Sequence, residues 1–343
     1  MQLCMQGAHL RRYAFLFGKE SLHGEYHGLY ATGQCLTREE NSFLSDDVQR
    51  PVLLIGGTSI TLNDQHELIQ HLIASGMTVA AIDYPMGSLL GPAIRPKLFR
   101  KSAFKDYVSR LKEDRHVKGI DIVAHSYAAF EVVRTLMSDP LGYRSWVKSV
   151  LFINPPGFRR KIGAVTHCLR FILGYVLLGW LKMFAHMVGL GRGPIGEDDP
   201  WKTIYIHRQI CGIAAMASRA FKDPLRSYRE ARDIVSFNIL PAMAALSRQY
   251  GYDLNLFLNV DDAIVPFKDT LNAVLGFLPG ENIVIARGGH NDLIFQDWQR
   301  ESFTSFLRRI RRRSIAHSRA REAGAEIAFN ARNPKDHLPP ART

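Results

Sequence analysis

Serine, aspartate and histidine side chains follow three of the short apolar runs in this 343-residue chain. They are Ser126 after Ile120–Ala124, Asp261 and Asp262 after Leu254–Leu258, and His290 after Asn282–Ala286. A histidine held between a carboxylate and a serine hydroxyl makes that hydroxyl a nucleophile, which is the chemistry of acyl transfer. If the three runs are strands of one open sheet, these side chains meet at the edge where such sheets bind ligands.

Apolar runs that alternate with helical patterns predict the elements that position these residues. The runs are Pro51–Ile55, Met77–Ile82, Ile120–Ala124, Val147–Ile153, Leu254–Leu258 and Asn282–Ala286. Helical patterns cover Leu62–Ser75, Ser102–Glu113, Ala128–Met137, Asp269–Leu275 and Asp297–Ile310. We therefore expect an α/β fold with a mostly parallel central sheet flanked by helices. Before it, Arg12–Phe17 and Glu25–Tyr30 predict an antiparallel hairpin.

The alternation stops between residues 158 and 250, which look mostly helical and contain no strand-like run. We expect four units: a first part of the core (1–157), a helical cap or lid insertion (158–250), a second part of the core (251–313) and a basic tail (314–343). Beyond Arg313 the apolar periodicity ends, and Arg, Pro and Asn accumulate. The tail is therefore predicted to be disordered.

Ser126 lies in the segment GIDIVAHSYAAF, where a predicted strand runs straight into a predicted helix. Such a sharp turn needs small residues two positions before and two after the serine, here Ala124 and Ala128. The segment resembles the nucleophile elbow, G-x-S-x-G, of the α/β-hydrolase superfamily, with both glycines replaced by alanine. For this segment alone, a serine that only caps the helix is the alternative.

Two further segments extend the resemblance. NVDDAIVP is similar to the superfamily's acid turn, D-x-x-V-P; Asp262 occupies the acid position, and Asp261 is the alternative. IVIARGGHNDLIF resembles the catalytic-histidine loop and carries His290. The order Ser126, Asp262, His290 is the order of α/β-hydrolases among the large serine-hydrolase folds.

The resemblance also implies an oxyanion hole. One backbone N–H would come from Tyr127, directly after the serine, and the other from Thr58 in the loop GGTS. Each such donor typically lowers the barrier by about 2.7–4 kcal/mol. A plain Gly-rich turn is the alternative for that loop. We interpret His125 as a packing and polar anchoring residue, and Asn154 excludes a catalytic acid after the run that precedes it.

The expected activity is that of a serine hydrolase that cleaves an ester or thioester through an acyl-enzyme, with Ser126, Asp262 and His290 as its catalytic triad. Acyltransferases and C–C bond hydrolases use the same triad on the same fold, so the residues do not separate these reactions. A non-catalytic binding protein that keeps the fold is a third alternative, supported by the alanines beside Ser126.

A run of apolar residues in the predicted cap bears on the substrate. Cys168–Leu190 is apolar nearly all round its predicted helix, so this helix is buried, or it binds an acyl group or touches a membrane. We therefore expect a bulky hydrophobic acyl substrate and a role in lipid metabolism; a well-packed cap helix is the alternative. No nucleotide-binding motif and no metal-ligand spacing occurs, so no cofactor and no metal is expected.

The net charge of +12 is concentrated at the C-terminus. From Arg308 onward there are nine Arg and one Lys against two Glu and one Asp. This basic segment fits peripheral contact with an acidic membrane surface, or it only complements the dipole of a helix end. Without aromatic interleaving, nucleic acid is not an expected partner. The sequence predicts a cytoplasmic protein. It has no secretory signal and no apolar run of about 20 residues, and its cysteines are scattered (Cys4, Cys35, Cys168, Cys211).

Overall fold

The structure is a computed structural model of the 343-residue chain. It describes residues 16–17, 26–31, 50–57, 65–82, 108–109, 111–113, 117–158, 238–262, 264–295 and 297–332. Most of the predicted helix Ser102–Glu113 and most of the predicted cap therefore lie outside the described residues.

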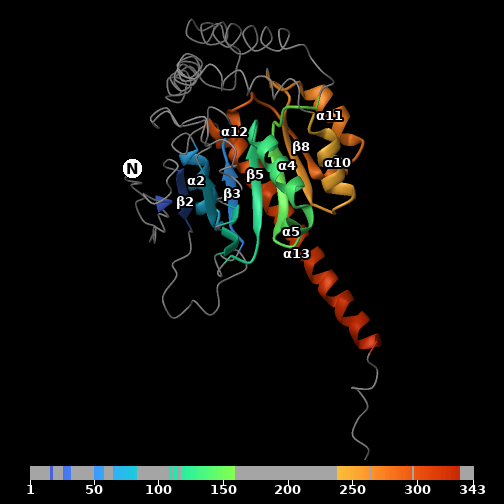
Figure 1. Ribbon diagram of the computed structural model, residues 1–343. Coiled ribbons are helices and arrows are strands. Elements are labelled where there is room, and N and C mark those ends of the chain that lie inside the picture. Colours follow the sequence, from blue (N-terminus) through green and yellow to red (C-terminus); the bar gives the residue numbers. More distant parts are fainter. Residues whose placement is uncertain are drawn as a thin grey trace, which may run out of the picture.

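An eight-stranded sheet forms the centre of the molecule, in the order β1-β2-β4-β3-β5-β6-β7-β8 (Figure 1). Its strands are β1 (Leu16–Phe17), β2 (Tyr26–Ala31), β3 (Val52–Ile55), β4 (Val79–Ile82), β5 (Ile120–His125), β6 (Val147–Ile153), β7 (Leu254–Asn259) and β8 (Ile283–Ala286). The six strands from β4 to β8 are parallel, while β2 pairs antiparallel with β4 and β1 with β2. The predicted parallel sheet and N-terminal hairpin are both confirmed.

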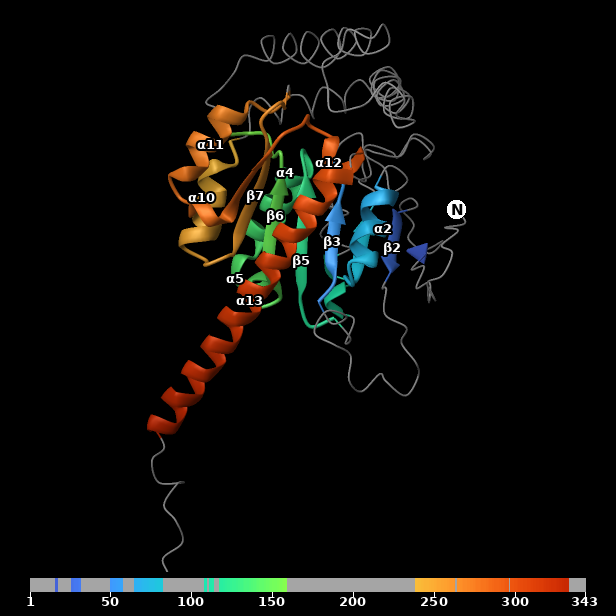
Figure 2. The ribbon, with the colours of Figure 1, turned by 180° about the vertical axis from the view of Figure 1, so that it is seen from behind.

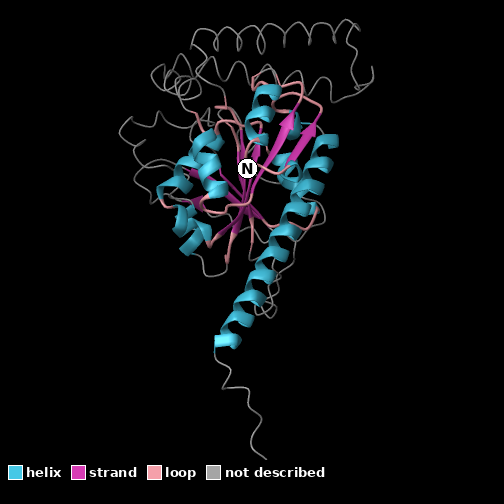
Figure 3. Cartoon of the chain, turned by 90° about the vertical axis from the view of Figure 1, so that its right-hand side faces the viewer, coloured by secondary structure: helices cyan, strands magenta, loops and turns pink. Residues whose placement is uncertain are grey.

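Helices cover both faces of the sheet (Figures 2 and 3). They are α2 (His66–Ala74), α4 (Ala128–Ser138), α5 (Pro140–Arg144), α10 (Leu240–Arg248), α11 (Phe267–Leu275), α12 (Asp292–Phe295) and α13 (Asp297–Arg332), with a 3₁₀ turn at Gly280–Asn282. Residues of α4, α5, α10 and α11 share one apolar cluster with the sheet, and residues of α2, α12 and α13 share the other. Because apolar side chains meet helices on both sides, the central strands have no solvated face.

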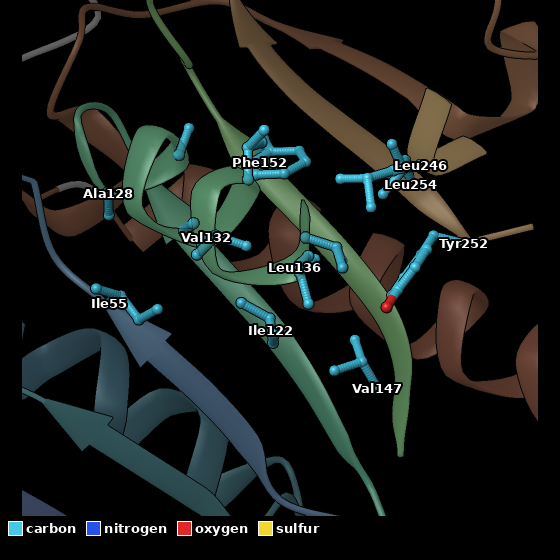
Figure 4. Packing of buried hydrophobic residues seen from close by; sticks show 14 of the residues in the cluster. Ile55, Ile122, Ala128, Val132, Leu136, Val147, Phe152, Leu246, Tyr252 and Leu254 are labelled. Carbon is cyan, nitrogen blue, oxygen red and sulfur yellow. The ribbon is translucent and has the colours of Figure 1, made fainter. Parts of the chain in front are cut away.

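The α4 helix packs closely against the strands beside it (Figure 4). Its residues Val132 and Leu136 are buried with Ile122 of β5 and Phe152 of β6. Burying an aliphatic or aromatic side chain of this size contributes about 1.5–3 kcal/mol to stability. The N-terminus of α4, and with it the turn that carries Ser126, is therefore held firmly against the sheet.

The α10 helix corrects the predicted end of the cap. Ile239, Met243 and Leu246 are buried in the same cluster as α4, so residues 240–248 belong to the core layer and not to an insertion that ends at 250. The spacing of these residues puts them on one helix face, as a crossover helix between β6 and β7 requires. Helical pattern alone does not separate a cap helix from a core helix.

The α13 helix corrects the predicted tail. It continues to Arg332, whereas we expected helix only to Ile310 and a disordered tail from residue 314. Ala, Arg and Glu are abundant after residue 314 and favour helix without an apolar stripe. Residues 333–343 lie outside the described residues.

Two arginines of the basic run join α13 to the sheet. Arg311 Nη1 lies 3.6 Å from Asp121 Oδ2, and Arg313 Nη2 donates to Asp253 Oδ1 at 2.7 Å. Arg311 is buried, and both cations have acidic partners within the protein. Within the part of the chain that the structure describes, no helix combines the length and apolar character needed to cross a membrane.

Candidate active site

Ser126 occupies a sharp turn between β5 and α4. Its φ of 53° lies in the left-handed region, and its backbone N–H donates to the carbonyl of Ile153 at 2.8 Å. Such a conformation in a residue other than glycine typically costs about 1–3 kcal/mol and is concentrated at functional sites. Ala124 and Ala128, the flanking small residues, are completely buried. The turn therefore has the strained backbone that the sequence motif predicts.

Asp262 follows β7 and is the carboxylate that contacts His290. Its side chain is 1 % exposed, and Oδ1 accepts hydrogen bonds from the backbone N–H groups of Ile264 and Val265, both at 2.8 Å. Oδ2 is thereby directed at His290 Nδ1, 2.6 Å away. Asp261, the alternative acid, is exposed and accepts instead from the Gly288 N–H at 3.2 Å.

His290 lies between the carboxylate and the hydroxyl. Its Nε2 is 2.7 Å from Ser126 Oγ, and the residue is 7 % exposed. Because the Asp262 carboxylate accepts from Nδ1–H, Nε2 is left to accept a hydrogen bond from the Ser126 hydroxyl. The structure thus brings Ser126, Asp262 and His290 into one hydrogen-bonded row at the carboxyl ends of three parallel strands.

Of the two residues whose backbone N–H groups were predicted to form the oxyanion hole, the structure describes Tyr127 but not Thr58. Tyr127 lies directly before α4 and is buried. Thr58 lies outside the described residues, but its neighbour Gly57 is described. A Cβ on Gly57 would come within 3.0 Å of Ser126 Cβ and of His125 Nδ1. The loop therefore passes Ser126 so closely that a larger residue at position 57 would press against Ser126 and His125.

His125 is an anchoring residue, as its position in the sequence led us to expect. It is buried, and its Nε2 donates to the backbone carbonyl of His290 at 2.9 Å. Burial lowers the pKa of His125 to about 3, and the neighbouring His290 acts in the same direction. A neutral ring at neutral pH whose Nε2 already donates a hydrogen bond is no candidate for the general base.

Three buried amide side chains contact the loop from Arg287 to His290, the histidine loop. Asn154 donates to the carbonyl of His290 at 3.0 Å, Asn259 donates to that of Gly289 at 2.7 Å, and Gln299 donates to that of Arg287. The sequence motifs gave Asn259 and Gln299 no role, because an isolated amide at a strand end or in a helix carries no signal of its partner. Among the described residues, no three His, Cys, Asp or Glu side chains cluster as a metal site requires.

Comparison with known proteins addresses the fold. No protein-family model and no curated protein matches the chain. Among solved structures, a bromoperoxidase from Bacillus anthracis is 14 % identical at a TM-score of 0.54, covering 83 % of this chain and 96 % of that one. A carboxylesterase structure from Nitrososphaera gargenis is 13 % identical at a TM-score of 0.51 and covers 84 % of this chain and 96 % of that one.

A further match is a serine-to-alanine mutant of the meta-cleavage product hydrolase from Pseudomonas fluorescens. It is 15 % identical at a TM-score of 0.52 and covers 83 % of this chain and 95 % of that one. At such identities the likeness concerns the fold and not the reaction. The arrangement of a mostly parallel sheet between helical layers is shared over most of each chain. The chain has the α/β-hydrolase fold.

Proposed function

We propose that this protein is a serine hydrolase that cleaves an ester or thioester of a hydrophobic acid. The single observation that carries the proposal is the row of two short hydrogen bonds, 2.7 Å from Ser126 Oγ to His290 Nε2 and 2.6 Å from His290 Nδ1 to Asp262 Oδ2. These contacts join residues from three loops that are up to 164 positions apart in the chain. The left-handed backbone of Ser126 at the same point supports a functional role.

The proposed reaction begins when Ser126 Oγ attacks the carbonyl carbon of the substrate while His290 Nε2 removes the hydroxyl proton. Asp262 keeps the proton on Nδ1 and stabilises the imidazolium that forms. The oxyanion of the tetrahedral intermediate accepts hydrogen bonds from the N–H groups of Tyr127 and Thr58. His290 then protonates the departing alcohol or thiol, and the carbonyl re-forms as an acyl ester on Ser126.

In the second half of the cycle, His290 removes a proton from water, and the resulting hydroxide attacks the acyl ester. Collapse of the second intermediate releases the acid and returns the proton to Ser126. These residues and water are sufficient for both halves.

Two observations support an ester or thioester of a hydrophobic acid as the substrate. The fold is shared with carboxylesterases, and the 23-residue segment Cys168–Leu190 is apolar over most of its length. That segment lies outside the described residues, so the hydrophobic substrate rests on composition. Cytoplasmic location and peripheral contact with an acidic membrane also rest on sequence; Arg308, Arg309 and Arg312 are the exposed cations of the basic run.

Labelling with a fluorophosphonate probe tests the proposal. Such a probe forms a bond to an activated serine, so we expect labelling of the wild type and none of Ser126→Ala. Ser138→Ala is the matched control, because Ser138 lies at the far end of α4 and donates to the Thr135 carbonyl. Failure to label the folded wild type, together with no turnover of short-chain aryl esters, would overturn the proposal.

A chain-length series of aryl esters then defines the acyl group. We expect kcat/KM to rise from short to medium or long chains. Addition of a competing alcohol or amine separates hydrolysis from acyl transfer, since a transferase would form the new ester or amide as its main product.

A further inference from the structure

The loop that carries His290 is held by hydrogen bonds along its whole backbone. Each of its four carbonyls, from Arg287 to His290, accepts a hydrogen bond from a group outside the loop. The donors are Gln299 Nε2 to Arg287, the Asp261 N–H to Gly288, Asn259 Nδ2 to Gly289, and both Asn154 Nδ2 and His125 Nε2 to His290. The carbonyl of His290 thus receives two side-chain donors.

Asn154 links this loop to the strands beneath it. It is the first residue after β6, is 1 % exposed and has a left-handed φ of 45°. Its Oδ1 accepts from the backbone N–H of Asn259 at 2.9 Å, so its Nδ2 must face the carbonyl of His290. One amide therefore ties the end of β6 to the end of β7 and to the histidine loop at once.

Asn259 and Gln299 continue the link. Asn259 Oδ1 accepts from Gln299 Nε2 at 3.2 Å, and Gln299 is fully buried. Gln299 also needs Gly288, because a Cβ there would lie 2.1 Å from Gln299 Nε2, and the φ of 122° at Gly288 suits glycine. The three amides form a continuous row beneath the loop.

We propose that Asn154, supported by Asn259, is a positioning residue for His290. This inference rests on the proposed function, in which His290 transfers protons. Both ring nitrogens of His290 hold short hydrogen bonds, so a rotation of its peptide unit would lengthen at least one of them. An asparagine side chain supplies an amide donor and a carbonyl acceptor in fixed directions, whereas an ionised aspartate of the same shape supplies acceptors only.

The test compares Asn154→Asp and Asn154→Gly with the wild type. The aspartate variant keeps the shape and the bond from the Asn259 N–H, but it turns an oxygen toward the His290 carbonyl. The glycine variant accommodates the left-handed backbone and removes the side chain, so it remains informative if the aspartate variant does not fold. Asn282→Asp is the matched control: Asn282 Nδ2 donates to the Leu254 carbonyl at 2.8 Å, at the opposite end of β7.

Two measurements read the result. The first is the second-order rate of fluorophosphonate labelling, which we expect to fall about 10²-fold in both Asn154 variants, as displacement of a reacting group by about 1 Å typically does. The second is the rate at which diethyl pyrocarbonate modifies His290, read by peptide mass. We expect it to rise at least tenfold, because the ring is now held loosely. For Asn282→Asp we expect both rates within about twofold of wild type.

The outcomes separate the two proposals. If both Asn154 variants keep both rates within about twofold of wild type while Ser126→Ala abolishes labelling, the positioning role is refuted and the hydrolase stands. If the wild type neither labels nor turns over short-chain aryl esters, the hydrolase fails, and the modification rate of His290 still decides whether Asn154 holds this loop. Equal effects of Asn154→Asp and Asn282→Asp would show a general loss of packing and would also refute the positioning role.

Discussion

Replacing Asp262 by asparagine tests the geometry of the site most directly. Asp262 Oδ1 accepts from the N–H groups of Ile264 and Val265, and Oδ2 faces His290 Nδ1. In Asp262→Asn, the side-chain oxygen must stay with the two backbone donors, because an amide nitrogen there would oppose N–H with N–H. The amide nitrogen is therefore forced toward His290.

The consequence is the wrong tautomer of His290. An amide N–H that points at Nδ1 makes Nδ1 the acceptor and places the ring proton on Nε2. A protonated Nε2 cannot accept the proton of Ser126. Turning the amide over breaks two backbone hydrogen bonds, each with a net contribution of about 1 kcal/mol. At about 1.4 kcal/mol per factor of ten, the productive orientation is populated at only a few per cent.

The productive orientation of this variant also lacks the carboxylate charge that stabilises the imidazolium. We therefore expect kcat/KM to fall by about 10³-fold, which corresponds to about 4 kcal/mol of transition-state stabilisation. The fold should be retained, because the two backbone hydrogen bonds remain. The assay is hydrolysis of an aryl ester near pH 8, with thermal unfolding as the check on folding.

Asp261→Asn is the matched control. Asp261 is exposed and its side chain accepts from the Gly288 N–H rather than from His290, so we expect less than a threefold change in kcat/KM. A fall of less than tenfold in Asp262→Asn, or an equal fall in both variants, would refute the reasoning.

Three further substitutions have defined outcomes. Ser126→Gly should abolish labelling yet raise Tm by about 2 °C, since relief of the left-handed strain contributes about 1 kcal/mol; an unchanged or lower Tm contradicts this. Gly57→Ala should slow labelling at least tenfold, whereas Gly280→Ala, with open space around its Cβ, should not; equal rates contradict the close approach. The pKa of His125 is about 3 in the folded protein, against an ordinary value of 6.5. Between these pH values the unfolded chain therefore binds one proton more than the folded protein. The free energy of unfolding consequently falls as the pH drops below 6.5, by up to about 1.4 kcal/mol per pH unit. His125→Gln keeps a donor toward His290 without titrating, and urea unfolding at several pH values should show a shallower slope.

The central sheet was predictable because its strands are buried on both faces. All residues of β3, β5 and β7 are buried, which is why each reads as a short apolar run between helical patterns. Parallel strands place their carboxyl ends at one edge, so Ser126, Asp262 and His290 could be expected to meet before any distance was known. The choice between Asp261 and Asp262 needed the backbone geometry after β7.

The amide row beneath His290 could not be predicted from sequence. Asn154, Asn259 and Gln299 come from the ends of β6 and β7 and from α13, and an isolated amide has no periodicity to mark it as buried. The core position of α10 and the length of α13 were missed for a related reason. Periodicity reports that a helix has an apolar face, or lacks one, but not which layer it covers.

The alanines beside Ser126 weigh less against catalysis than the motif alone suggests. The elbow needs space for the serine side chain, and the structure provides it across the sheet. Ile55 of β3 pairs with Ala124 of β5, so Gly57 and Ser126, each two residues farther on, come to lie side by side. The missing Cβ of Gly57 leaves room at 3.0 Å from Ser126 Cβ. A pattern written along one strand does not include this contact, and Ala124 and Ala128 are compatible with the turn at Ser126 when glycine at position 57 leaves this space.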